Sequence, residues 1–171
     1  MSEIIPIGPY HPLQEEPEFF KLHVEGEKVI KLDIELGYNH RAVEKLAESK
    51  SWEQVVFLVE RICGICSTSH PAASVNAAED LGGIEAPERA QWIRTIICEL
   101  ERVHSHLLWV GLAGHFIGYN TVWMWVWKYR EIVCDLLDKI TGNRQSYAMF
   151  KPGGVRRDIL DDDVPWIRDS L

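Results

Sequence analysis

Residues 86–112 read APERAQWIRTIICELERVHSHLLWVGL, and this stretch decides the fold class. Pro87 stands near the first turn, where a helix tolerates proline. Apolar residues then recur at the three- and four-residue spacing of one helix face. We expect them to form a single apolar stripe: Ile93, Ile96, Ile97, Leu100, Val103 and Leu107. A stripe of this length must be covered by other helices, so the stretch predicts a helical bundle.

The segments around this helix extend the same pattern. Helical spacing begins at Arg41 and continues to about Ser49. Ser51 and Gln54 then satisfy the capping-box rule and predict a helix that runs into Cys63. We also expect helices over 70–81, before paired glycines, and over 121–141, before Gly142. Residues 41–160 are therefore predicted to form the bundle.

The N-terminal part follows a different pattern. Residues 1–18 are punctuated by prolines and predict a loop arm. Apolar residues alternate on both sides of EGEK over residues 19–36, which predicts an antiparallel β-hairpin with strands near 19–25 and 28–36. We expect residues 1–171 to form a single domain of mainly α structure, with a small N-terminal β-hairpin (α+β).

Composition narrows the classes of function. The 171 residues carry a net charge of −8, which argues against a nucleic-acid-binding protein because phosphate attracts a positive surface. We see no basic and apolar leader of the kind that directs secretion. The four cysteines are therefore interpreted as intracellular thiols or metal ligands, not as a disulfide framework.

Residues 107–127 carry no aspartate, glutamate, lysine or arginine, and 21 residues are long enough to span a bilayer. His115, Asn120 and the sequence GYNT argue for a helix break within the stretch. We therefore favour a buried pair of packed helices over a membrane span. The four tryptophans of this stretch would also suit an interface with a partner.

The sequence RICGICSTSH, residues 61–70, carries the strongest chemical signal. Cys63 and Cys66 stand at the C-x-x-C spacing that places two thiolates on one metal. The spacing alone leaves four interpretations open: a structural zinc site that includes His70, a redox dithiol, a metal shared with ligands from elsewhere, and two buried thiols. Cys98 and Cys134 fall on helix interiors and are expected in the core.

Other polar residues allow two interpretations each. Glu15 and Glu16 suit a solvated acidic loop, although a carboxylate near a metal site could relay protons. Arg156 and Arg157 follow a Pro-Gly-Gly turn. They suit surface positions, and they also suit a clamp on a carboxylate or a place near a cofactor.

A series of motifs over about residues 6–160 then points to a known family. In order, the motifs are GPYHPLQEEPEFF, GYNHRAVEKL, VERICGICSTSH, RAQWIR, ELERVHSHLLW, GNR and PGGVRRD. The series resembles the N-terminal half of the large subunit of membrane-bound, energy-converting (group 4) nickel–iron hydrogenases. It also resembles relatives of that subunit in complex I, the 49 kDa type, and in the archaeal membrane-bound sulfane reductase. The resemblance implies a nickel–iron hydrogenase large-subunit-like fold.

The resemblance implies specific roles around the C-x-x-C motif. Cys63 and Cys66 match the first metal-binding pair of the hydrogenases, in which one cysteine is terminal to nickel and the other bridges nickel and iron. Arg61 matches the arginine before this pair. His70 matches the histidine that lies near the bridging sulfur.

The resemblance also implies roles away from that motif. Glu16 matches an acidic residue of the N-terminal loop, a candidate first proton acceptor. His11 matches a histidine of the loop that borders the quinone cavity in complex I. Arg156 and Arg157 lie in a shared turn near the interface with the small iron–sulfur subunit.

One departure from the family sets the expected function. The hydrogenases close their site with a second C-x-x-C near the C-terminus, and the 171 residues contain none. We therefore expect a nickel–iron centre to be completed either by a separate chain that carries the C-terminal half or by a part of the same protein outside residues 1–171. The expected function is a redox component of a membrane-bound, ion-translocating respiratory complex related to complex I. A nickel-free member that reduces sulfane sulfur or polysulfide, and a non-catalytic scaffold half-subunit, are the alternatives.

The resemblance also implies partners and a location. We expect a small subunit that carries iron–sulfur clusters, membrane-embedded ion-translocating subunits, and a peripheral position on the cytoplasmic side of the cell membrane. No nucleic-acid partner is expected.

Overall fold

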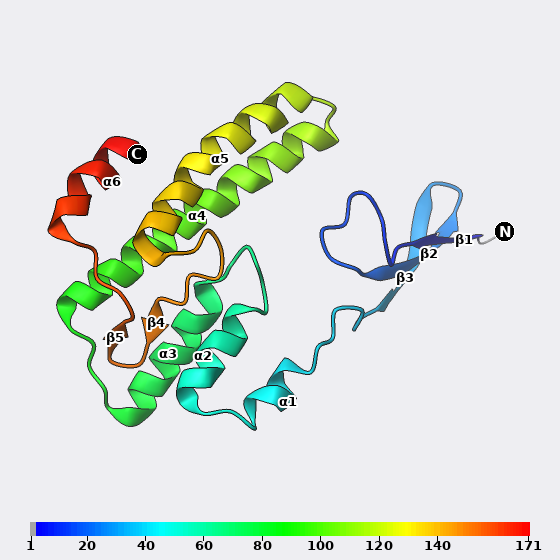
Figure 1. The fold of residues 1–171 in the computed structure, drawn as a ribbon. Helices are drawn as coiled ribbons and strands as arrows, with labels where there is room; N and C mark the ends of the chain where they lie inside the picture. Colours follow the sequence, from blue (N-terminus) through cyan, green and yellow to red (C-terminus); the bar gives the residue numbers. More distant parts are fainter. Residues whose placement is uncertain (1–2) are drawn as a thin grey trace. The chain divides into compact units, whose positions relative to one another are not determined.

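The computed structural model describes residues 3–171 and is shown in Figure 1. The chain forms two compact units, Met1–Ala42 and Val43–Leu171, and each is described by itself. The first unit is a small sheet, and the second contains all the helices. That the chain functions as one domain stays a prediction.

The first unit is a three-stranded antiparallel sheet in the order β1-β2-β3. Its strands are β1 (Glu3–Ile7), β2 (Phe19–Glu25) and β3 (Lys28–Glu35). The hairpin of β2 and β3 is confirmed, but the loop predicted for residues 1–18 is wrong at its start, where β1 pairs with β2. Pro6 is compatible with this strand because β1 is an edge strand, which can leave one backbone position without a ladder hydrogen bond.

The second unit begins with α1 (Val43–Ala47) and α2 (Trp52–Glu60). The predicted capping box is confirmed: the Ser51 side chain accepts from the Gln54 backbone N–H, and the Gln54 side chain accepts from the Ser51 N–H. The helix ends at Glu60, before the predicted end near Cys63. The N–H of Arg61 reaches back to the carbonyls of Leu58 and Val59, so the chain tightens there and leaves the helix.

The next three helices are α3 (Ser69–Gly82), α4 (Glu88–Phe116) and α5 (Asn120–Thr141). Gly83 ends α3 and Gly142 ends α5, both in the left-handed conformation that favours glycine. The helices α4 and α5 form a long antiparallel pair, with the expected break at residues 117–119. Among residues 3–171, no helix is both long enough and apolar enough to cross a membrane.

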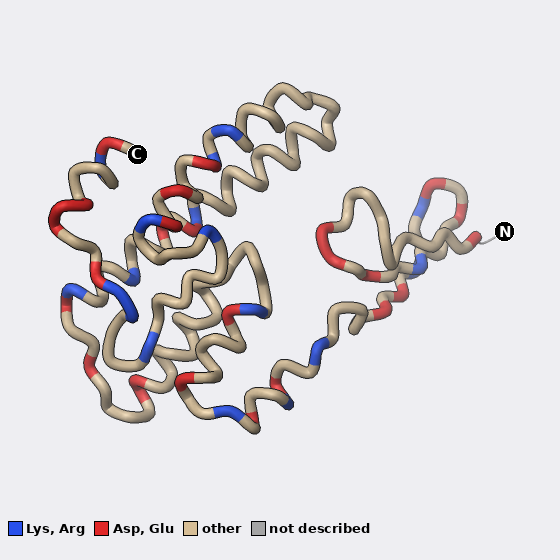
Figure 2. The backbone as a smooth tube through the Cα atoms, in the orientation of Figure 1, with Lys and Arg blue, Asp and Glu red and all other residues tan. Residues whose placement is uncertain are grey.

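Two glycines let α4 and α5 approach closely. A Cβ at Gly114 would lie 3.0 Å from Val122 Cγ1, and one at Gly111 would lie 3.3 Å from Val126 Cγ1. The pairing covers only the facing sides of the two helices. Trp109 is 69% exposed and Met124 is 66% exposed, so the prediction of a buried helix pair is wrong for these outer faces. Figure 2 shows that the end of the hairpin carries no aspartate, glutamate, lysine or arginine.

The inner face of α4 differs from the predicted stripe. Ile93, Ile97 and Leu100 are buried, but Ile96 and Val103 are exposed. Polar side chains occupy the buried positions instead: Arg94, Glu101 and His104. The positions of α4 that are buried are therefore set by the helical period, even where the residue at such a position is polar.

The chain after α5 returns to the bundle through a short hairpin and ends in a helix. These elements are β4 (Phe150–Lys151), β5 (Gly154–Val155), the 3₁₀ helix η1 (Asp161–Asp163) and α6 (Val164–Ser170). The segment before β4 enters the core, where Tyr147 and Met149 are buried together with residues of α3, α4 and α5. This segment thereby holds the helices against each other around one hydrophobic core.

Candidate functional site

The two cysteines of the C-x-x-C motif lie on the loop between α2 and α3. The Cys63 Sγ accepts hydrogen bonds from the backbone N–H of Ile65 at 3.4 Å and of Cys66 at 3.2 Å. Ser67 Oγ donates to the carbonyl of Cys63 at 3.2 Å. The loop therefore folds around the Cys63 sulfur, and both thiols are half-buried and free.

Cys66 has two polar neighbours. Its Sγ lies 3.6 Å from His70 Nε2. Burial, followed by the neighbouring Cys63 thiol, raises the pKa of Cys66 to about 12. Cys66 thus holds its proton unless a cation stabilises its thiolate, which is the condition under which cysteines bind a metal.

Arg61 begins the loop and joins it to a buried carboxylate. Its Nη1 donates to Glu60 Oε2 and also to the carbonyl of Phe57, at 3.2 Å. Glu60 is buried, and its Oε1 accepts from the backbone N–H of Ala148 at 2.6 Å. Burial raises the pKa of Glu60, while the charges of Arg61 and Arg156 lower it. Arg61 is therefore placed to balance a buried acid next to the dithiol.

A groove of about 400 Å³ opens beside Cys66. It is bounded by the start of α3 and the middle of α4, with these lining residues: Ile65, Cys66, Thr68, Ser69, Ala72, Cys98, Glu101, Arg102, Ser105 and His106. Cys134 is buried as predicted, whereas Cys98 is only half-buried and faces this groove. The groove gives Cys66 the access to solvent or to a partner that a redox site needs.

Glu101 is a site residue that the sequence reasoning missed. Its Oε2 accepts from the Thr68 N–H at 2.6 Å, and its Oε1 accepts from the Thr68 hydroxyl at 2.5 Å. Burial raises the pKa of Glu101, and hydrogen bonds from Thr68 oppose the rise. The signal was present in the sequence, because position 101 follows Arg94 and Ile97 on the buried face at the helical period.

A second polar cluster lies deeper between α4 and α5. His104 Nδ1 lies 3.4 Å from Arg130 Nη2, and the His104 carbonyl accepts from Arg130 Nε at 3.3 Å. Burial, and then the charge of Arg130, lower the pKa of His104 to about 4. Among residues 3–171, His104 Nε2 and the Tyr147 hydroxyl are buried without a hydrogen-bond partner. This histidine is therefore a neutral core residue that accepts from Arg130.

His11 and Glu16 lie in the first compact unit, on the loop between β1 and β2, and both are exposed. His11 Nδ1 accepts from the Leu13 N–H at 3.2 Å, and Glu16 Oε2 accepts from the Asn39 side chain. The first contact lies within the loop, whereas the second ties the loop to the segment that follows β3. The roles expected for these residues toward a metal or a quinone stay predictions.

Arg156 and Arg157 lie directly after β5, and both are exposed. The Arg156 N–H donates to the Met149 carbonyl at 2.9 Å, which fixes the turn. The guanidinium of Arg157 lies against Gly142, where a Cβ would be 2.3 Å from Nη1. Their expected role at a cofactor or a subunit interface stays a prediction.

The dithiol is the candidate metal-binding group of residues 3–171. Within residues 3–171, no group of three or more histidine, cysteine, aspartate or glutamate side chains is arranged to hold a metal ion. Two adjacent thiols with His70 next to one of them fit one side of a metal centre. A closed structural zinc site would need four ligands, so the geometry does not favour that interpretation.

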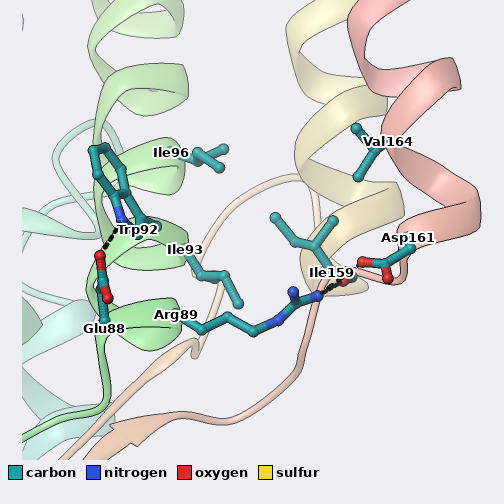
Figure 3. A pocket seen from close by; sticks show the side chains of 8 residues that line it. All are labelled: Glu88, Arg89, Trp92, Ile93, Ile96, Ile159, Asp161 and Val164. Atoms are coloured by element: carbon teal, nitrogen blue, oxygen red, sulfur yellow. Dashed lines mark hydrogen bonds and ion pairs between the residues drawn. The ribbon is translucent and has the colours of Figure 1, made fainter.

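A second cavity, of about 390 Å³, lies at the start of α4. Figure 3 shows Ile93 and Ile96 of α4 pointing toward Ile159 and Val164 across it, with Trp92 beside Glu88 on the same helix. Arg89 bridges the two sides by donating to the Ile159 carbonyl at 2.7 Å. None of the residues predicted for the site lines this cavity, so it is separate from the dithiol.

The fold and the dithiol loop match known proteins. Residues 41–112 match the family described as nickel-dependent hydrogenase. Residues 117–171 match the family described as the 49 kDa subunit of the respiratory-chain NADH dehydrogenase. In fold, the chain is nickel–iron hydrogenase large-subunit-like, and the resemblance drawn from its motifs is confirmed.

Individual relatives are subunits of the same kinds of complex. The chain is 51% identical to the membrane-bound hydrogenase subunit alpha of Pyrococcus furiosus, over 98% of the chain and 39% of the relative. It is 44% identical to formate hydrogenlyase subunit 5 of Escherichia coli, over 95% of the chain and 29% of the relative. A solved structure of an archaeal membrane-bound sulfane sulfur reductase matches with a TM-score of 0.90 and 35% identity. The match covers 99% of the present chain and 45% of the matched chain in that structure. The chain thus spans less than half the length of each.

Proposed function

We propose that the chain supplies one half of a redox site in a membrane-bound, ion-translocating respiratory complex related to complex I. The carrying observation is the pair of half-buried thiols on one turn, with His70 Nε2 3.6 Å from the Cys66 sulfur. The identity of 51% to a membrane-bound hydrogenase subunit supports hydrogenase-type chemistry for this pair. Activity would arise only within the complex, because two thiolates leave a metal with unfilled positions.

Cys63 and Cys66 would hold one side of a nickel–iron centre, and ligands from outside residues 1–171 would fill the remaining positions. Such a centre supplies reversible reduction of protons to hydrogen when bound. His70 would accept or return a proton at the Cys66 sulfur, and Glu16 of the N-terminal loop would be the first proton acceptor. Arg61 keeps a positive charge beside the thiols and is itself held by Glu60.

The partners follow from this role. A small subunit would carry the iron–sulfur clusters that deliver electrons to the dithiol. Membrane-embedded subunits would couple electron transfer to ion movement, with this chain on the cytoplasmic side. The uncharged, tryptophan-rich end of the α4–α5 hairpin supports contact with such partners.

A second candidate is a nickel-free site that reduces sulfane sulfur. The TM-score of 0.90 to the sulfane sulfur reductase complex supports it. Cys63 and Cys66 would then be redox or structural thiols near the proximal cluster of the partner. The dithiol geometry suits both candidates, because a reactive thiol pair and a metal-binding pair need the same proximity.

Metal analysis of the intact complex separates the two candidates. About one nickel per copy of the chain is expected for the hydrogenase site. Iron and labile sulfide without nickel would instead support sulfane sulfur reduction. Measurement of hydrogen evolution and of sulfide production by the same preparation assigns the substrate.

Variants of the cysteines test whether the dithiol acts at all. Cys63→Ser and Cys66→Ser should each abolish turnover while the complex still assembles. Cys134→Ser is the matched control, since Cys134 is buried in α5 away from the loop. Unchanged turnover in both loop variants would support the scaffold alternative and refute the proposal.

A further inference from the structure

Glu101 is joined to the dithiol loop by contacts that the proposed chemistry does not use. Its carboxylate spans the Thr68 backbone N–H and the Thr68 hydroxyl at 2.6 and 2.5 Å. Glu101 is 4% exposed and Thr68 is 2% exposed, so water does not compete for these bonds. The two residues are 33 positions apart, which makes this a tertiary contact between α4 and the start of α3.

Thr68 is the residue before the first turn of α3, and its own side chain does not cap the helix. The carboxylate of Glu101 therefore supplies from α4 the acceptor that the N-terminus of α3 lacks locally. Cys66 stands two residues before Thr68, and His70 stands two residues after it. A clamp on Thr68 thus fixes the two groups whose sulfur and nitrogen lie 3.6 Å apart.

We propose that Glu101 is a positioning residue for the dithiol site, because it clamps Thr68 and so sets Cys66 and His70 relative to each other. Glu101 also lines the groove beside Cys66, so the clamp forms one wall of the access route. The effect on turnover rests on the proposed function, whereas the effect on the Cys66 environment does not. A glutamine at position 101 keeps the clamp, since its carbonyl accepts from the Thr68 N–H and its amide donates to the Thr68 hydroxyl.

The test uses the intact complex with Glu101→Ala, Glu101→Gln and Thr68→Val. The rate of Cys66 alkylation by iodoacetamide is read from peptide masses, with Cys134 as internal reference. Glu101→Ala should raise the Cys66 rate about tenfold, as expected for the loss of two hydrogen bonds to a buried charged group. The alkylation rate of Cys66 in Glu101→Gln should remain within about twofold of the parent rate. The rate in Thr68→Val should fall between those of the two Glu101 variants.

Turnover per assembled complex is the second measurement. Glu101→Ala should lower kcat about tenfold with KM within about twofold, and Glu101→Gln should restore most of kcat. Glu99→Ala is the matched control, because Glu99 lies on the same helix, is exposed and forms an ion pair with Arg102.

Two outcomes would overturn the inference. A Glu101→Gln variant as impaired as Glu101→Ala would assign the effect to the charge of Glu101 and not to the clamp. Assembled Glu101→Ala complexes with parental alkylation and kcat, but lower yield, would assign Glu101 to folding alone. If Cys63→Ser leaves turnover unchanged while Glu101→Ala still alters Cys66 alkylation, the proposed function fails and the positioning role stands.

Discussion

Glu79 of α3 and Arg94 of α4 form a two-pronged ion pair in the interior. Arg94 Nη2 donates to Glu79 Oε1 at 2.6 Å, and Nη1 donates to Oε2 at 3.0 Å. The pair also holds the β4–β5 hairpin, since the Gly153 N–H donates to Glu79 Oε1 at 2.8 Å and Arg94 Nη2 donates to the Gly154 carbonyl at 2.8 Å. Three segments far apart in the sequence therefore meet at one pair of charges.

Removal of one partner of this pair should destabilise the protein strongly. Arg94→Met leaves the Glu79 carboxylate buried without its countercharge, and we expect a loss of about 3–5 kcal/mol in the free energy of unfolding. Denaturant titration followed by circular dichroism measures this loss. Arg102→Met removes an exposed ion pair with Glu99 and should cost about 1 kcal/mol or less. Equal effects of the two substitutions would contradict the importance of burial.

His104 should make stability depend on pH. Burial lowers the pKa of His104 to about 4, below its ordinary value of 6.5, so the unfolded chain binds this proton more readily. The contribution of His104 is complete above about pH 6.5 and is lost as the pH falls toward 4, by up to about 3 kcal/mol.

Comparison with His104→Asn isolates this effect, because asparagine keeps an acceptor for Arg130 and does not titrate. The variant should lose less stability than the parent between pH 6.5 and 4. Glu60 and Glu101 act with the opposite sign, since burial raises the pKa of each and their ionisation at higher pH weakens the fold. Both carboxylates are present in the parent and the variant, so they cancel in the difference.

Gly114 should resist replacement by a larger residue. A Cβ there meets Val122 Cγ1 at 3.0 Å, so Gly114→Val should cost about 1–3 kcal/mol in the free energy of unfolding by pushing α4 and α5 apart. Thermal unfolding of the single variants and of Gly114→Ala with Val122→Ala tests the contact. The double variant should be more stable than the sum of the two single changes predicts.

The capping box should contribute measurably to the stability of α2. Ser51→Ala removes the acceptor of the Gln54 N–H and should cost about 1 kcal/mol. Ser51→Asp retains an acceptor and should lose a few tenths of a kcal/mol at most. An alanine variant as stable as the aspartate variant in denaturant titration would show that α2 is held by packing alone.

Local signals in the sequence were sufficient for most elements. Ser51 with Gln54, and the glycines at 83 and 142, mark helix ends through hydrogen bonds and backbone angles that involve only neighbouring residues. At residues 3–7 the prolines suggested a loop where the structure has a strand, because an edge strand tolerates Pro6 where a central strand would not. The apolar stripe of α4 was also partly wrong, since Ile96 and Val103 face outward.

The sequence by itself determined the C-x-x-C spacing, the helix boundaries near caps and the large-subunit resemblance, because these depend on residues close together in the chain or on ordered motifs. Only the tertiary structure decided that Glu101 clamps Thr68, that Arg94 neutralises Glu79 and that Cys98 faces the Cys66 groove. Each of these contacts joins residues 15 or more positions apart. A buried charge is costly unless another polar group pairs with it. The packing of α3 against α4 decides which residue lies near enough to do so.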